Sequence, residues 1–196
     1  MKKFLLSICF FACLSGISEA QVTFVDNRPV FGVRGEFTVT APDEGLWSVA
    51  TGWENDWMCG WKHADPQEME KSGEWTILSG RMTLEGGDRL LRDSYRQVRD
   101  GLVQCVRRYE WTGNQVLPDV TLSVRMKMDG ERMMPLLPGI LYYGNKNGAK
   151  VNPEIIPVYN GEPGEFAIFE EHRYPMPFAM LENAEKGYAA AVHTVP

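Results

Sequence analysis

The stretch that decides the fold is Leu90–Thr112, LLRDSYRQVRDGLVQCVRRYEWT. Two segments rich in strand-forming residues flank the dipeptide Asp100-Gly101, which is favoured in two-residue type I′ turns. The sequence therefore predicts a β-hairpin in which residues 90–99 pair with residues 102–112.

The turn also predicts a register for this hairpin. With a two-residue loop, counting outward places Asp93 opposite Arg108, Arg92 opposite Tyr109, and Leu90 opposite Trp111, all favourable cross-strand pairs. One face would then gather Arg92, Arg96, Arg107, Tyr109 and Trp111. Arginine binds carboxylates through paired hydrogen bonds, and aromatic rings offer apolar stacking surfaces. This face is therefore a candidate substrate-binding surface for an acidic sugar, and the alternative is an ordinary solvated face.

The rest of the chain also favours β-structure. Period-two alternation recurs between Gly, Pro, Asn and Asp turns, which is typical of short antiparallel strands. The expected strands lie at 22–25, 35–40, 46–51, 74–84, 120–128, 140–143, 166–171 and 187–195. The one helical candidate is residues 66–72. The predicted fold class is all-β, an antiparallel β-sandwich formed as one domain by residues 21–196.

The N-terminus has the pattern of a cleavable secretory signal. Lys2 and Lys3 precede an apolar run at 4–14, and small residues lead to Ala20, so cleavage after Ala20 is expected. The mature protein would then be secreted or periplasmic. The alternatives are a lipoprotein acylated at Cys13 and a buried N-terminal helix. The run is too short to span a membrane, and no later segment is long and apolar enough to do so.

Charge and cysteine content narrow the function classes. The formal net charge is −6, and an acidic surface argues against nucleic acid and anionic membranes as partners. Two cysteines follow the predicted leader, Cys59 and Cys105, and their spacing matches neither a zinc site nor a redox pair. They form either one disulfide or two buried thiols. No metal, cofactor, phosphate-loop or serine-hydrolase motif is recognised.

Aromatic residues supply a second candidate surface. Trp47, Trp53, Trp57 and Trp61 crowd into a short polar stretch. Tryptophan next to acidic and amide side chains is a mixture that suits a carbohydrate cleft. The alternative is that these tryptophans fill the core, because tryptophan is mostly buried in proteins.

Two loop-proximal segments, LYYGN at 141–145 and FEEHRYPMP at 169–177, complete the candidates. Glu170 and Glu171 cannot together be the carboxylate pair of a glycosidase, since neighbours on a strand point to opposite faces. The catalytic residues are therefore unknown, with Glu170, Glu171 and His172 as candidates. Further candidate substrate-binding residues are Tyr143, Asn145 and Arg173.

Three segments together, 88–111, 138–145 and 169–177, resemble the N-terminal β-supersandwich of secreted bacterial polysaccharide-degrading enzymes. The resemblance implies a galactose-mutarotase-like sandwich that, in those enzymes, precedes an (α/α) toroid. It further implies a poly- or oligosaccharide partner and a glycoside hydrolase or polysaccharide lyase context, in which this region alone would not be active. The apolar end at 188–196 likewise predicts the front part of a longer protein, unless that strand completes a sheet. The alternative is a non-catalytic carbohydrate-binding or structural cell-envelope protein.

Overall fold

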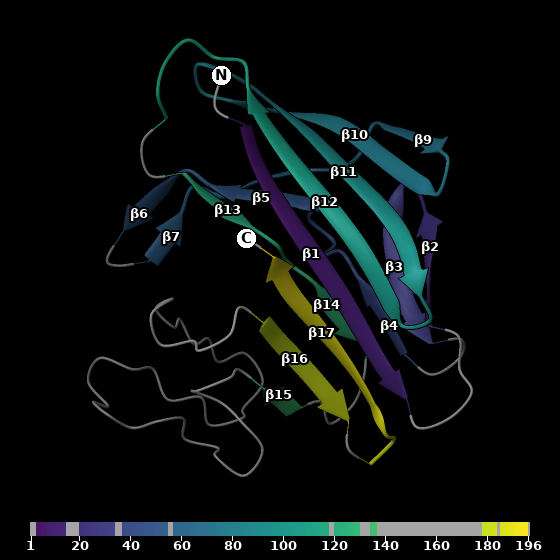
Figure 1. Cartoon of the computed structure of the whole chain (residues 1–196). Helices are drawn as coiled ribbons and strands as arrows, with labels where there is room; N and C mark the ends of the chain where they lie inside the picture. Colours follow the sequence, from purple (N-terminus) through teal and green to yellow (C-terminus); the bar gives the residue numbers. More distant parts are fainter. Residues whose placement is uncertain are drawn as a thin grey trace.

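The computed structural model (Figure 1) describes residues 3–14, 20–33, 37–54, 57–117, 120–129, 134–136, 178–183 and 185–195. Within these ranges every helix or strand element is a β-strand, and every strand pair is antiparallel. No helix in this part of the chain is long and apolar enough to cross a membrane. The strands predicted at 140–143 and 166–171 lie outside the described residues.

One layer is an eight-stranded sheet. Its strands, in sheet order, are β15 (Met134–Leu136), β16 (Phe178–Asn183), β17 (Tyr188–Val195), β1 (Lys3–Leu14), β12 (Leu102–Trp111), β11 (Gly87–Arg99), β10 (Trp75–Leu84) and β9 (Glu68–Ser72).

The second layer consists of two smaller sheets. One has the order β14 (Lys127–Asp129), β4 (Phe37–Thr40), β3 (Arg28–Val33) and β2 (Ala20–Val25). The other has the order β13 (Thr121–Ser123), β5 (Trp47–Ala50) and β8 (Lys62–Ala64). The strands β6 (Gly52–Glu54) and β7 (Trp57–Cys59) form a separate hairpin beside them.

The core lies between the two layers. Side chains alternate along β12, so that Val103, Cys105, Arg107 and Tyr109 are buried while their neighbours are more exposed. Buried residues of the large sheet form one cluster with Phe31, Val39, Trp47 and Val49 of the smaller sheets. Alternation of this kind buries one face of each strand and leaves the other toward solvent. The predicted antiparallel β-sandwich is confirmed.

The turn of the β11–β12 hairpin differs from the prediction. A type I′ turn needs positive φ at both central residues, but only Gly101 (φ 73°) has it and Asp100 does not. Positive φ at two consecutive residues occurs instead in the β2–β3 turn, at Asp26 (φ 50°) and Asn27 (φ 59°).

The predicted register of this hairpin is wrong by one residue. Arg99 opposes Leu102 as expected, but the next pair is Gln97 with Val103, which leaves Val98 as an extra, bulged residue. A bulge shifts every later pair on one strand relative to the other. Because strand neighbours face opposite sides, a shift of one residue exchanges the two faces of β11.

Two further expectations are corrected. Residues 66–72 contain no helix; Glu68–Ser72 is the edge strand β9, held by pairing with β10 and exposed along its length. The single strand expected at 120–128 is divided into β13 and β14, which pair with β5 and β4 respectively. Its apolar residues still pack against the core, so the predicted alternation is correct and the predicted continuity is wrong.

The predicted leader contributes the strand β1. This strand lies between β12 and β17 and pairs with both (Figure 1). Ala20, the residue before the predicted cleavage point, begins β2 and opposes Val33. Cleavage and export stay predictions. No disulfide joins Cys59, which is half-buried, to Cys105, which is buried, so the two-thiol alternative describes this structure.

Candidate functional site

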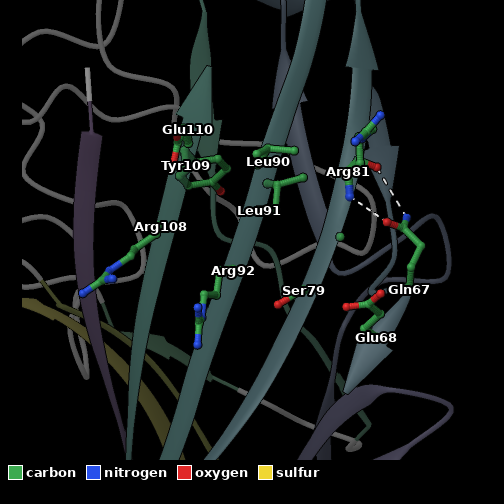
Figure 2. A pocket seen from close by; sticks show the side chains of 11 residues that line it. Gln67, Glu68, Ser79, Arg81, Leu90, Leu91, Arg92, Arg108, Tyr109 and Glu110 are labelled. Carbon is green, nitrogen blue, oxygen red and sulfur yellow. Dashed lines mark hydrogen bonds between the residues drawn. The ribbon is translucent and has the colours of Figure 1, made fainter. Parts of the chain in front are cut away.

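The outer face of the β11–β12 hairpin has a hollow of about 750 Å³ whose lining combines charged, polar and apolar residues (Figure 2). Two of its arginines have acidic partners: Arg92 lies 3.4 Å from Glu70, and Arg81 lies 3.1 Å from Asp88. Arg108 points toward β1 in Figure 2, away from Arg92. Arg81 and Arg92 on this exposed surface thus form local charge pairs, and a substrate-binding role for Arg92 stays a prediction.

Arg96 is also on the outer side of the hairpin. It donates to the Gln104 side chain at 2.7 Å, forms an ion pair with Glu74, and lies over the Trp75 ring at 4.7 Å. The slipped register therefore separates Arg92 and Arg96 from the aromatic residues predicted to lie beside them.

Arg107 is on the inner face, but it belongs to the core. Only 2% of the residue is exposed, and its Nε and Nη2 donate to the two carboxylate oxygens of Asp93 at 2.8 and 2.7 Å. The Tyr95 hydroxyl donates to the same carboxylate at 2.8 Å. Burial opposes the charge, yet Asp93 more than compensates and raises the pKa of Arg107 well above its ordinary value. These hydrogen bonds use the Arg107 guanidinium to stabilise the core.

At the open end of the hairpin, the inner face borders a cleft of about 970 Å³. Its walls come from the ends of β11 and β12, from the following loop at 112–117, and from residues 120–122 at the start of β13. Tyr109 and Trp111 line it, as do Leu117, Val120 and Leu122, which also pack on the core. The cleft is thus mainly apolar and aromatic, as ligand pockets usually are.

Arg89 is the cation of this cleft. It opposes Trp111 in the register, and its guanidinium carbon lies 5.8 Å from the Tyr109 ring centroid and 6.0 Å from that of Trp111. Its Nε is buried and has no hydrogen-bond partner among the described residues, and no described carboxylate pairs with it. Burial lowers the pKa of Arg89, although an arginine keeps its charge at neutral pH.

The hydroxyl of Tyr109 is a second unsatisfied group in the cleft wall. It is buried and makes no hydrogen bond within the described part of the chain. Burial raises its pKa, so the phenol stays protonated and able to donate. A buried donor without a partner destabilises a protein by about 1 to 3 kcal/mol, which a ligand acceptor would relieve.

Trp111 is held in place before any ligand arrives. Its indole Nε1 donates to the carbonyl oxygen of Gln115 at 2.8 Å. The ring lies against Gly113, where an added Cβ would be only 2.2 Å from a ring atom. The Thr112 amide donates to the carbonyl oxygen of Asp88 at 2.9 Å, which ties the loop to β11. A fixed aromatic ring loses little entropy on binding.

The tryptophan cluster is divided between core and surface. Trp47 is completely buried, and its ring occupies the space that a Cβ on Gly80 would need. Trp61 stacks on His63 with 6.2 Å between ring centroids, whereas Trp53 is 52% exposed. The side chain of Trp57 lies outside the described residues.

The remaining predicted site residues, Tyr143, Asn145, Glu170, Glu171, His172 and Arg173, lie outside the described residues, and their roles stay predictions. In the described ranges, no three side chains of His, Cys, Asp or Glu gather as metal ligands would.

Comparison of the chain with protein-family models, curated proteins and solved structures finds no match. The function of the chain is therefore inferred from the geometry of the cleft.

The predicted register placed Arg92, Arg96 and Arg107 on one face with Tyr109 and Trp111. Of these, Arg107 shares that face but is paired with Asp93, and Arg89 takes the place opposite Trp111. The residue that sequence reasoning missed is Arg89, and the sequence carries no signal for the extra residue, Val98, that brings Arg89 opposite Trp111. Allowing a bulge there moves each partner on β11 by one position.

Proposed function

We propose that this protein binds an acidic glycan, such as a uronate-containing oligosaccharide, in the cleft formed by Arg89, Tyr109 and Trp111. The observation that carries the proposal is the half-buried guanidinium of Arg89, which lies over two aromatic rings without a carboxylate partner among the described residues. Groups of this kind are expected where a ligand supplies the missing partner.

The three residues match three parts of such a sugar. The guanidinium of Arg89 would bind the carboxylate, for which its planar donors are suited. The Tyr109 hydroxyl would donate to a ring or hydroxyl oxygen, and the fixed Trp111 ring would stack on the apolar face of the sugar. The cleft volume of about 970 Å³ is at the upper end of the range for small-molecule sites.

The N-terminal pattern and the resemblance to secreted polysaccharide-degrading enzymes support the same proposal. An exported sandwich would meet glycans outside the cytoplasm. The proposal concerns binding, and a catalytic role for Glu170, Glu171 or His172 is a separate prediction.

Calorimetric titration with an oligogalacturonate and a neutral oligosaccharide of equal length tests the proposal. We expect the acidic ligand to bind more tightly, and Arg89→Ala to weaken it by about 1.5 to 3 kcal/mol, roughly 10- to 150-fold. The contact should weaken with added salt, because Arg89 is only half-buried.

Arg92→Ala is the matched control, because Arg92 lies on the same strand but on the outer face, beside Glu70. It should leave both affinities unchanged. If Arg92→Ala weakens binding while Arg89→Ala does not, the ligand occupies the outer face and the proposal is wrong. Absence of binding to either glycan at millimolar concentration would also refute it.

A further inference from the structure

The hairpin β6–β7 begins close to the wall of the Arg89 cleft. Thr121 lines the cleft and pairs with Ala50, the last residue of β5. The chain then passes Thr51 and enters β6, so Trp53 is three residues beyond this pair, roughly 10 Å along an extended chain. Figure 1 shows β6 and β7 beside the start of β13.

Trp53 is unusual among the described tryptophans because half of its surface is exposed (52%). It belongs neither to the buried core cluster nor to the partly buried residues packed against it. One exposed apolar side chain is normal on a protein surface. Trp53 therefore offers a second, exposed ring a short distance along the chain from a strand that borders the cleft.

The base of this hairpin is fixed, although a two-stranded hairpin alone is only marginally stable. The Thr51 amide donates to the Cys59 carbonyl oxygen at 3.2 Å, and the Thr51 hydroxyl donates to the Gly60 carbonyl oxygen at 2.9 Å. Gly60 has a φ of +63°, and an added Cβ there would meet the Thr51 side chain at 2.5 Å. Trp53 is therefore presented from an anchored hairpin.

Arg125 lies toward the other end of the small sheet that contains β5 and β13: Thr121 pairs with Ala50 and Ser123 with Ser48, so the chain moves away from Trp53 on its way to Arg125. Arg125 lies over the Trp61 ring at 5.8 Å, and Trp61 stacks on His63 of β8. In this three-stranded sheet β5 lies between β8 and β13, the strand that contains Thr121. Arg125 is also paired with Glu44 at 3.4 Å, so it adds no unpaired cation to the path of a ligand that leaves the Arg89 cleft.

We infer that the Arg89 cleft is the first subsite of a longer binding surface, in which Trp53 stacks on a ring several units away along the same acidic polysaccharide. This inference rests on the proposed function and adds that the ligand is a polymer rather than a single sugar. Trp53 acts as a binding residue on one chain that contacts both places.

The test compares ligand lengths. Wild-type protein is titrated with galacturonate oligomers from two to eight units, and affinity should rise with length until the chain reaches Trp53. Trp53→Ala should leave the shortest oligomer unaffected and weaken the longest by roughly 3- to 10-fold, the range for one aromatic stacking contact. Trp53→Phe should restore part of this loss, because it keeps an aromatic ring.

Met69→Ala serves as the control, because Met69 is exposed to a similar extent (46%) but lies on the edge strand β9. It should bind every oligomer as the wild type does, and thermal melting should show that the variants are folded. Equal wild-type affinity for short and long oligomers, or an equal loss for all lengths in Trp53→Ala, overturns the extended surface while the Arg89 site stands. If no oligomer binds and Arg89→Ala has no effect, both proposals fail together.

Discussion

In the middle of the β11–β12 hairpin the inner face is a closed core, whereas at its open end the same face borders a cleft. Both places contain an arginine beside a tyrosine. Arg107 is bonded to both oxygens of Asp93 and is 2% exposed, while Arg89 is half-buried over Tyr109 and Trp111 without a described acidic partner.

The difference separates a structural charge from one available to a ligand. A buried ion pair is stable only when its hydrogen bonds are satisfied, and the loss of one partner leaves a costly buried charge. Asp93 satisfies Arg107, and Tyr95 and the Ser123 carbonyl oxygen complete this network. Arg89 lies over the faces of two rings, and its buried Nε has no hydrogen-bond partner within the described part of the chain.

The largest effect should follow from breaking the Asp93–Arg107 pair. Arg107→Ala should lower the free energy of unfolding by about 3 to 5 kcal/mol, because Asp93 would be left buried and charged. Arg89→Ala in the same urea titration should change it by less than about 1 kcal/mol, since no described ion pair is lost. Similar losses in the two variants would contradict the distinction between the two ends.

A smaller effect should follow from moving the Trp111 ring. Gly113→Ala places a methyl group 2.2 Å from the ring, and we expect a loss of about 1 to 3 kcal/mol in stability, as for overpacked sites. Binding of the acidic glycan should weaken as well.

Gly73→Ala separates this clash from the cost of backbone conformation. An added Cβ at Gly73 meets nothing within 4 Å, but its φ is +59°. It should cost about 1 kcal/mol without any change in binding. Unchanged glycan affinity in Gly113→Ala would argue against a fixed ring as the platform.

The smallest effect at neutral pH should be that of Tyr109→Phe, which removes a hydroxyl without a described partner. Stability should stay the same or rise slightly. Burial raises the pKa of Tyr109 in the folded state, so the native protein keeps a proton that the unfolded chain loses near pH 10. The stabilisation that comes from keeping Tyr109 protonated is complete below pH 10 and is lost as pH rises above it.

Denaturant titrations from about pH 8 to about pH 11.5 test whether the free energy of unfolding falls above pH 10. The wild type should lose stability above pH 10, with Tyr95 contributing in the same direction because burial, and then the charge of Asp93, raise its pKa. The Tyr109→Phe curve should be shallower by up to about 1.4 kcal/mol per pH unit. Parallel curves would show that Tyr109 titrates normally.

Much of the fold could be predicted because alternation reports directly on burial. The strands predicted at 74–84 and 187–195 lie within one residue of β10 and β17. Alternation does not report on partners, which is why the division of the segment at 120–128 between two sheets could not be predicted. The polar segment at 66–72 has no clear period, and only its pairing with β10 makes it a strand.

The candidate site was half predictable for a related reason. Local turn chemistry indicated the hairpin correctly, but one bulged residue decides which arginine reaches Tyr109 and Trp111. A bulge at Val98 depends on how the hairpin packs against the other layer, which local sequence does not encode. Arg89 could be identified only once the register was known.

If the predicted leader is exported and cleaved, the place of β1 in the sheet makes folding compete with export. β1 is antiparallel to both β12 and β17, so those two strands run parallel to each other on either side of the predicted leader. Folding first would trap the leader by backbone hydrogen bonds on both sides, whereas cleavage first would leave two open edges. The partners are remote in sequence, as in the pairing of Ser7 with Val195, and contacts of such separation form slowly. Because of that delay, export could take place before the sheet closes around β1.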